Sequence, residues 1–293
     1  MLIFTWIELV SGWGEEPESL VTAALAYSVL TLGAMAAYGA EAWARNGEAF
    51  SVYFNLFSRL SVFETRGGVV GVRPLLSGLP RLDRQPGTVA FLAVMIGTVT
   101  FDGLSQGALW RDESVDLTSR LVSLGISPEQ APRVTDTLGL GLGVAVIATF
   151  YVLGIAGARS VGGPLSAEKL RTGFIHTLVP IALVYVAAHY LTYLIFQGQA
   201  MAYLVSDPIG RGWDLFGTAS SAIDYGVISQ NATWYVQVAL VICGHVAALV
   251  LAHDRALSLY GHARLAVRSQ YWMLAVMVGF TTLALWLLAQ ANA

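Results

Sequence analysis

The chain is dominated by six long apolar stretches, which restrict its fold more than any other feature of the sequence. A helix needs about 20 mostly apolar residues to cross the hydrocarbon core of a membrane. Each stretch meets this requirement, so the sequence predicts an all-α integral membrane protein. The predicted transmembrane helices cover residues 19–43, 87–105, 137–158, 173–200, 232–253 and 271–290.

The composition supports a multi-spanning protein without a soluble domain. Only 12% of the 293 residues are charged, whereas a soluble domain usually carries about a quarter. The net charge of −3 favours no nucleic acid partner. We therefore treat residues 1–293 as a single membrane domain whose main surroundings are the lipid bilayer.

Three further segments are not expected to span. Residues 1–14 begin with MLIFTWIELVSG, which is apolar but too short to cross, and we interpret them as a partial first span of a longer protein. Residues 48–63 place aromatic side chains at helical spacing, which indicates an amphipathic helix, either interfacial or packed on the bundle. Residues 64–86 are rich in Gly, Pro and Arg and predict an irregular loop.

The distribution of basic residues predicts the orientation. If the acidic tip near residues 12–18 lies outside, twelve of the sixteen basic residues fall in inner loops and four in outer loops. This is the asymmetry that cytoplasmic loops show. We expect basic loops in the cytoplasm, a C-terminus outside, and a location in the bacterial inner membrane.

Histidines gather on two neighbouring predicted spans. His176 and His189 lie on the fourth span, and His245 and His253 lie on the fifth. Because the two helices run in opposite directions, His176 and His253 share an inner level, while His189 and His245 lie nearer the middle. Asp102 lies near the outer end of the second span. Ionisable groups inside a membrane are costly and often functional.

These five residues are candidate ligands for a divalent metal, copper or haem b, because neutral imidazole binds all three. A proton relay is a second interpretation, and hydrogen bonds between helices are a purely structural one. The thirteen-residue spacing of the fourth span turns its histidines to different faces, so the sequence only half supports a site for two haems. No catalytic residue is assigned.

Several motifs carry a family resemblance: EAFSVYFNLFSRL, GTVAFLAVMIGTVTFDGL, SDPIGRGWDLFGTA and WYVQVALVICGHVAALVLAHDRAL. With RSQYWML, they resemble the polytopic bacterial membrane proteins called fenitrothion hydrolases. The resemblance implies an inner-membrane protein that hydrolyses hydrophobic organophosphate esters. It also draws attention to further polar positions inside the motifs, namely Asp207, Arg211, Asp214, Asp254 and Arg255.

Three functions follow as hypotheses. The first is a membrane-bound phosphotriester hydrolase assisted by a metal. The second is a haem- or copper-binding redox or assembly protein that uses the paired histidines. The third is a transporter or a structural subunit, with another membrane subunit as its partner. In SDPIGRGWDLFGTA, a plain interfacial turn competes with a loop whose Asp207 and Asp214 face Gln197 and Gln199.

Overall fold

The computed structural model describes residues 1–82, 85–163 and 165–291, and this part of the chain is almost entirely helical. Six helical segments are long and apolar enough to cross a membrane, one for each predicted span. They are α2 (Pro17–Tyr38), α5 (Thr88–Ser105), α7 (Ala131–Ser160), the segment Ala167–His189, α12 (Gln230–Tyr260) and α13 (Ala263–Ala291).

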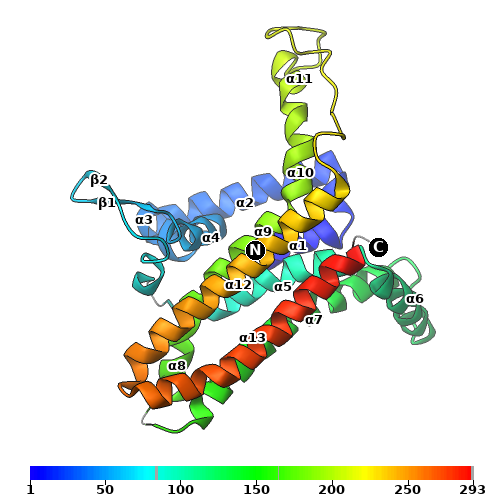
Figure 1. The fold of residues 1–293 in the computed structure, drawn as a ribbon. Coiled ribbons are helices and arrows are strands. Elements are labelled where there is room, and N and C mark those ends of the chain that lie inside the picture. Colours follow the sequence, from blue (N-terminus) through cyan, green and yellow to red (C-terminus); the bar gives the residue numbers. More distant parts are fainter. Residues whose placement is uncertain (83–84, 164, 292–293) are drawn as a thin grey trace.

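The bundle core is formed by α5, α7, α9 (Leu178–His189), α12 and α13 (Figure 1). Close packing of α5 on α7 depends on two glycines. A Cβ added to Gly97 would lie 2.5 Å from the Cα of Val144, and one added to Gly143 would lie 2.7 Å from the carbonyl oxygen of Gly97. The helices therefore touch backbone to backbone, as small residues allow in membrane bundles.

Two of the predicted spans end earlier than expected. The first stops at Tyr38 because Gly39 takes a positive φ of 88°, and a separate helix, α3 (Ala40–Asn46), follows. The fourth stops at His189 because Tyr190 leaves helical geometry. Beyond it, α10 (Leu191–Phe196), η4 (Gln197–Ala200) and α11 (Met201–Ser206) project away from the bundle (Figure 1).

Several shorter elements complete the described chain, and one helix was not expected. The predicted partial span contains α1 (Leu2–Leu9) and η1 (Trp13–Glu15), and the predicted amphipathic helix is α4 (Ala49–Ser58). The connection between α5 and α7 holds an unpredicted helix, α6 (Ala108–Ser123). The remaining pieces are η2 (Leu79–Arg81), α8 (Ala167–Phe174) and η3 (Ile175–Thr177).

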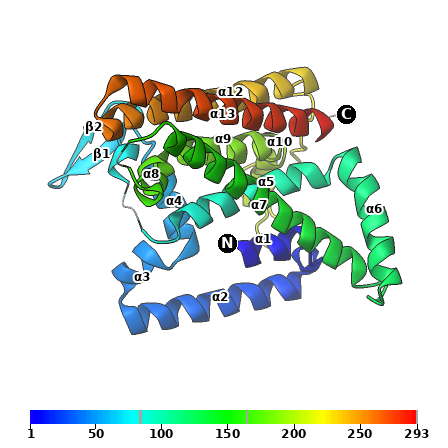
Figure 2. The same ribbon diagram turned by 90° about the horizontal axis from the view of Figure 1, so that it is seen from below.

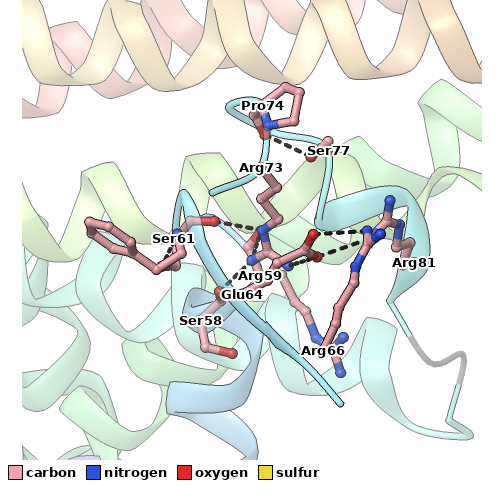
Figure 3. A network of polar contacts seen from close by, with 10 residues as sticks. Ser58, Arg59, Ser61, Glu64, Arg66, Arg73, Pro74, Ser77 and Arg81 are labelled. Atoms are coloured by element: carbon pink, nitrogen blue, oxygen red, sulfur yellow. Dashed lines mark hydrogen bonds and ion pairs between the residues drawn. The ribbon is translucent and has the colours of Figure 1, made fainter. Parts of the chain in front are cut away.

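The prediction of an irregular loop at 64–86 is wrong for its first part. Phe63–Arg66 (β1) and Val69–Val72 (β2) form an antiparallel hairpin, turned by Gly67 and Gly68 at positive φ. Figure 3 shows that Arg73 donates hydrogen bonds to the carbonyls of Ser58, Arg59 and Ser61. The Glu64 carboxylate lies among three arginine side chains, those of Arg66, Arg73 and Arg81. Contacts between side chains and residues many positions away thus order this segment. Residues 83–84 of the predicted loop lie outside the described part of the chain.

Candidate functional site

Asp102 and His189 form a close pair between two bundle helices. Asp102 lies one turn before the end of α5, and His189 is the last residue of α9. The Nε2 atom of His189 lies 2.7 Å from Oδ2 of Asp102, and the two side chains are 26% and 15% exposed. Two of the five residues predicted as ligands are therefore in direct contact, at a partly accessible position.

Glu8 and Tyr190 extend this pair into a cluster of four polar side chains. Tyr190 follows His189 directly, and its ring packs edge-on against the imidazole with centroids 4.8 Å apart. Glu8 on α1 interacts electrostatically with Asp102, His189 and the Tyr190 side chain. Three distant parts of the chain thus contribute to one site, which we call the carboxylate–histidine cluster.

The geometry of the cluster defines the chemistry of His189. Because carboxylate oxygens only accept hydrogen bonds when ionised, Nε2 of the imidazole is the donor to Asp102. In the neutral ring, Nδ1 then carries the lone pair and is the basic atom. A base oriented by a carboxylate is the arrangement that activates a nucleophile in many hydrolases.

His245 has different partners and does not meet His189. It is 2% exposed, and its Nδ1 lies 2.7 Å from the carbonyl oxygen of Val241. Its ring packs on Phe280 with centroids 5.4 Å apart and on Tyr185 with centroids 6.1 Å apart. The mid-level pairing of the two histidines, suggested by their depth in the sequence, is therefore not a contact.

The two histidines predicted to share the inner level, His176 and His253, also differ from each other. His176 is buried in η3 at the start of α9, whereas His253 is exposed on α12. Within residues 1–82, 85–163 and 165–291, no group of three or more His, Cys, Asp or Glu side chains is arranged to hold a metal ion. The candidate ligands are distributed over several environments, and Asp102 with His189 supplies two donor atoms.

The motif SDPIGRGWDLFGTA forms turns stabilised by its own carboxylates. The amides of Arg211 and Gly212 donate to Asp207 at 2.8 and 2.7 Å, and the amide of Ala219 donates to Asp214 at 2.9 Å. Slight desolvation alone would raise the pKa of Asp207. The hydrogen bonds from the backbone amides of Arg211 and Gly212 outweigh it and lower this pKa. Arg211 lies over the ring of Trp213, 5.9 Å from its centroid.

The alternative arrangement of this loop, with both aspartates facing Gln197 and Gln199, is wrong. Gln199 instead exchanges two hydrogen bonds with the backbone of Asp224, at 3.1 and 2.9 Å. The plain interpretation of the loop as a set of turns agrees with its contacts.

The triplet His253–Asp254–Arg255 lies in the last third of α12, towards its C-terminal end. His253 and Asp254 are exposed, and Nε of Arg255 donates to the carbonyl of Gly173 at 3.1 Å. Arg255 thus ties α12 to α8, a structural role at the opposite end of the bundle from Asp102.

A comparison of the chain with protein-family models, curated proteins and solved structures finds no match. The assignment of the site therefore depends on its geometry.

Three residues near the site were missing from the candidates named above: Glu8, Tyr185 and Tyr190. Glu8 interrupts the apolar run LIFTWIEL, and the two tyrosines lie four positions before and one position after His189. Since residues four apart share a helix face, the position of Tyr185 was a usable signal.

Proposed function

We propose that the chain is a multi-pass protein of the bacterial cytoplasmic membrane that hydrolyses lipid-soluble phosphotriesters, with His189 as general base. The observation that carries the proposal is the 2.7 Å contact between His189 Nε2 and Asp102 Oδ2. The motif resemblance to fenitrothion hydrolases supports the choice of substrate class.

In the proposed reaction, Asp102 holds the Nε2–H of His189 and leaves Nδ1 free to take a proton from water. The resulting hydroxide forms a bond to phosphorus as the bond from phosphorus to the aryl oxygen breaks. A nitrophenolate leaves as a stabilised anion, and the proton on Nδ1 is then released to solvent. General-base catalysis of this kind contributes about 10²- to 10⁴-fold to a rate.

The surroundings of the pair suit a hydrophobic substrate. The adjoining helix α10 exposes Tyr193 and Leu194, and the pair itself remains partly accessible. A substrate dissolved in the outer leaflet would approach along this apolar surface. In the proposed orientation the basic hairpin side faces the cytoplasm, and the cluster lies near the outer ends of α5 and α9.

Activation of water is placed on imidazole rather than on a bound metal, because Asp102 and His189 together supply two ligand atoms. The metal-assisted form of the hypothesis requires further ligands from outside this pair. Adding a divalent metal to the purified protein distinguishes the two forms.

The test is the release of a nitrophenol from an aryl phosphorothioate by protein in detergent micelles. His189→Gln should lower kcat by about 10²- to 10⁴-fold, and Asp102→Asn should also lower kcat because the imidazole loses its orienting carboxylate. His262→Gln, a change at an exposed histidine beyond α12, should leave kcat unchanged. Full activity in His189→Gln, or no turnover by the wild-type protein with or without metal, would contradict the proposal.

A second candidate function is proton-coupled transport. It is favoured by the electrostatic interaction of Glu8 with Asp102 and His189, since neighbouring acids and bases inside a membrane suit proton transfer. Proteoliposomes that take up protons without hydrolysing the phosphorothioate, and lose this uptake in Asp102→Asn, would select it.

A further inference from the structure

A cavity of about 530 Å³ lies where the end of α3, one side of α4 and the start of α5 meet. Its volume falls within the range of small-molecule sites. Of the described residues in its wall, two are arginines and none is acidic. The polar side chains of this wall are those of Arg45, Asn46, Asn55, Arg59, Gln85 and Thr88. Such a wall suits an anionic ligand.

Arg59 brings to this wall a donor that lacks an acceptor. It is the C-cap of α4, and its carbonyl accepts a hydrogen bond from Arg73 at 3.1 Å. Its Nε atom is buried, and no described residue accepts the proton of this atom. A guanidinium stays charged and cannot give up this proton. Since a buried charged donor without an acceptor is costly, an anion in the cavity would stabilise it.

The start of α5 adds backbone donors to the same wall. Gly87, the N-cap of α5, has a positive φ of 88° and no side chain that could cap the first turn. Both Gly87 and Thr88 line the cavity. The free amides and the positive dipole end of a helix start attract anions. Phosphate fits both features, because its oxygens accept from backbone amides and from a guanidinium.

The neighbouring hairpin segment carries a surplus of positive charge. Figure 3 shows Glu64 with three arginines around it, those of Arg66, Arg73 and Arg81. One carboxylate therefore faces three cations. The Glu48 carboxylate, which follows the cavity-lining Gly47, is already engaged by the amides of Phe50 and Ser51 and by the hydroxyl of Tyr27. The surplus favours a ligand with a net negative charge.

Apolar side chains on the same elements point to a lipid as the source of this charge. The hairpin segment and α4 expose Phe54, Phe63, Val69, Val70, Val72 and Leu75. An exposed apolar surface of this kind marks a site of interaction. Apolar side chains beside arginines are typical of a segment at the membrane interface, where the former enter the acyl region and the latter meet headgroups.

We propose that this cavity binds the headgroup phosphate of an anionic phospholipid, with Arg59 as its principal donor. The acyl chains lie along the exposed apolar side chains of the hairpin and α4. In the proposed orientation this is the cytoplasmic leaflet, whose surface is negatively charged. The inference rests on the proposed membrane location and uses no part of the proposed hydrolysis.

The test is native mass spectrometry of the protein released from an uncharged detergent, with phosphatidylglycerol and phosphatidylcholine of identical acyl chains. We expect the first phosphatidylglycerol to bind at least about tenfold more tightly than phosphatidylcholine, because Arg59 forms a charge-assisted hydrogen bond and no described acidic residue of the wall pairs with choline. Equal affinities of the wild-type protein for the two lipids would overturn the proposal.

Arg59→Gln should weaken binding of phosphatidylglycerol by about tenfold or more and leave that of phosphatidylcholine unchanged. The matched control is Arg120→Gln, which removes the same charge from an exposed position on α6. It should leave both affinities unchanged. Wild-type affinity for phosphatidylglycerol in folded Arg59→Gln contradicts the role given to this side chain.

A second variant keeps the test decisive if Arg59→Gln does not fold. Asn55 lines the cavity from an exposed position on α4, so its replacement should leave the fold intact. Asn55→Glu places a carboxylate in the wall and should weaken binding of phosphatidylglycerol, whereas Asn55→Gln should not. Equal affinities in these two variants would overturn the proposal.

Inorganic phosphate separates the two sources of the anion. At the same concentration as the lipid it should not displace phosphatidylglycerol, because it has no acyl chains to bind the apolar surface. Displacement at that concentration would assign the cavity to a soluble phosphate and overturn the lipid assignment. Failure of the hydrolysis assay leaves lipid binding intact, so the two proposals fail separately.

Discussion

Two segments with similar hydropathy occupy opposite surroundings in this molecule. The most apolar windows of α2 and of Ala167–His189 have mean hydropathies of 1.8 and 1.5, yet none of the first and 72% of the second is buried. In Figure 2, α2 lies apart from α12 and α13, on the far side of α1 and α5. Hydropathy identifies a candidate span, but it does not tell whether lipid or protein surrounds it.

The two segments also differ in what holds them. Leu170, Phe174, Val179 and Ile181 of the buried segment belong to the main core. By contrast, α2 is attached chiefly through its ends and through Tyr27, whose hydroxyl donates to Glu48 and whose ring packs edge-on against Phe50. The enclosed segment ends at His189, where the neighbouring helix α5 supplies Asp102 as its partner.

The largest difference should come from shortening an apolar side chain in each segment. Ile181 is fully buried, so Ile181→Ala should lower the free energy of unfolding by about 2–5 kcal/mol through the cavity it leaves. Leu30 is 60% exposed, so Leu30→Ala should change the free energy of unfolding by less than about 0.5 kcal/mol. Denaturant titration in mixed micelles measures both. Equal losses would show that α2 packs against a partner in the native assembly.

A smaller contrast is expected for glycine replacements. Gly97→Ala places its Cβ 2.5 Å from the backbone of Val144, and separating α5 from α7 should cost about 1–3 kcal/mol. A Cβ added to Gly33 of α2 would meet no heavy atom within 4 Å, so Gly33→Ala should stabilise the helix by about 0.5–1 kcal/mol. Thermal unfolding in detergent measures the resulting shifts in unfolding temperature. A lower unfolding temperature in Gly33→Ala would indicate a hidden contact of α2.

The smallest effect concerns the attachment of α2 to α4. Partial burial opposes ionisation of Glu48, but hydrogen bonds from Ser51, Tyr27 and Phe50 outweigh it and lower its pKa from 4.5 to about 2. The ionised side chain also caps the start of α4. Because the folded pKa is lowered, this stabilisation is complete above pH 4.5 and is lost as the pH falls towards 2.

Glu48→Gln should therefore destabilise α4 at neutral pH by about 1 kcal/mol or less, and the difference from wild type should disappear at low pH. Backbone hydrogen exchange of Ala49–Ser58, measured against pH in both proteins, provides the readout. A difference that persists at a pH of about 2 would contradict the role given to the charge.

The partial agreement between sequence and structure has a physical basis. All six apolar helices were predictable because their hydropathy is a local property, summed over about 20 residues. The ends at Tyr38 and His189 were missed, since a positive φ at Gly39 and a change of backbone geometry at Tyr190 do not interrupt an apolar run. The hairpin was missed because contacts of Arg73 and Glu64 with distant residues order it.

The candidate site was predictable in its parts but not in its pairing. Asp102 and His189 both stood out as ionisable groups in apolar segments, yet 87 positions separate them in the chain. Depth counted along a helix placed both His189 and His245 nearer the middle of the membrane, whereas the rotation of the packed helices turns His189 towards Asp102 and His245 towards Phe280. Rotation about a helix axis depends on the neighbours, which no single segment encodes.

The sequence by itself determined which segments are apolar helices and which of them carry ionisable groups, because both follow from the side chains of a continuous stretch. Only the tertiary structure decided which helix is enclosed, which carboxylate holds His189, and that Tyr185 and His245 lie side by side. These outcomes depend on how closely helices approach and how they are rotated. Glycine contacts such as that of Gly97 with Val144 set both, and they join residues far apart in the chain.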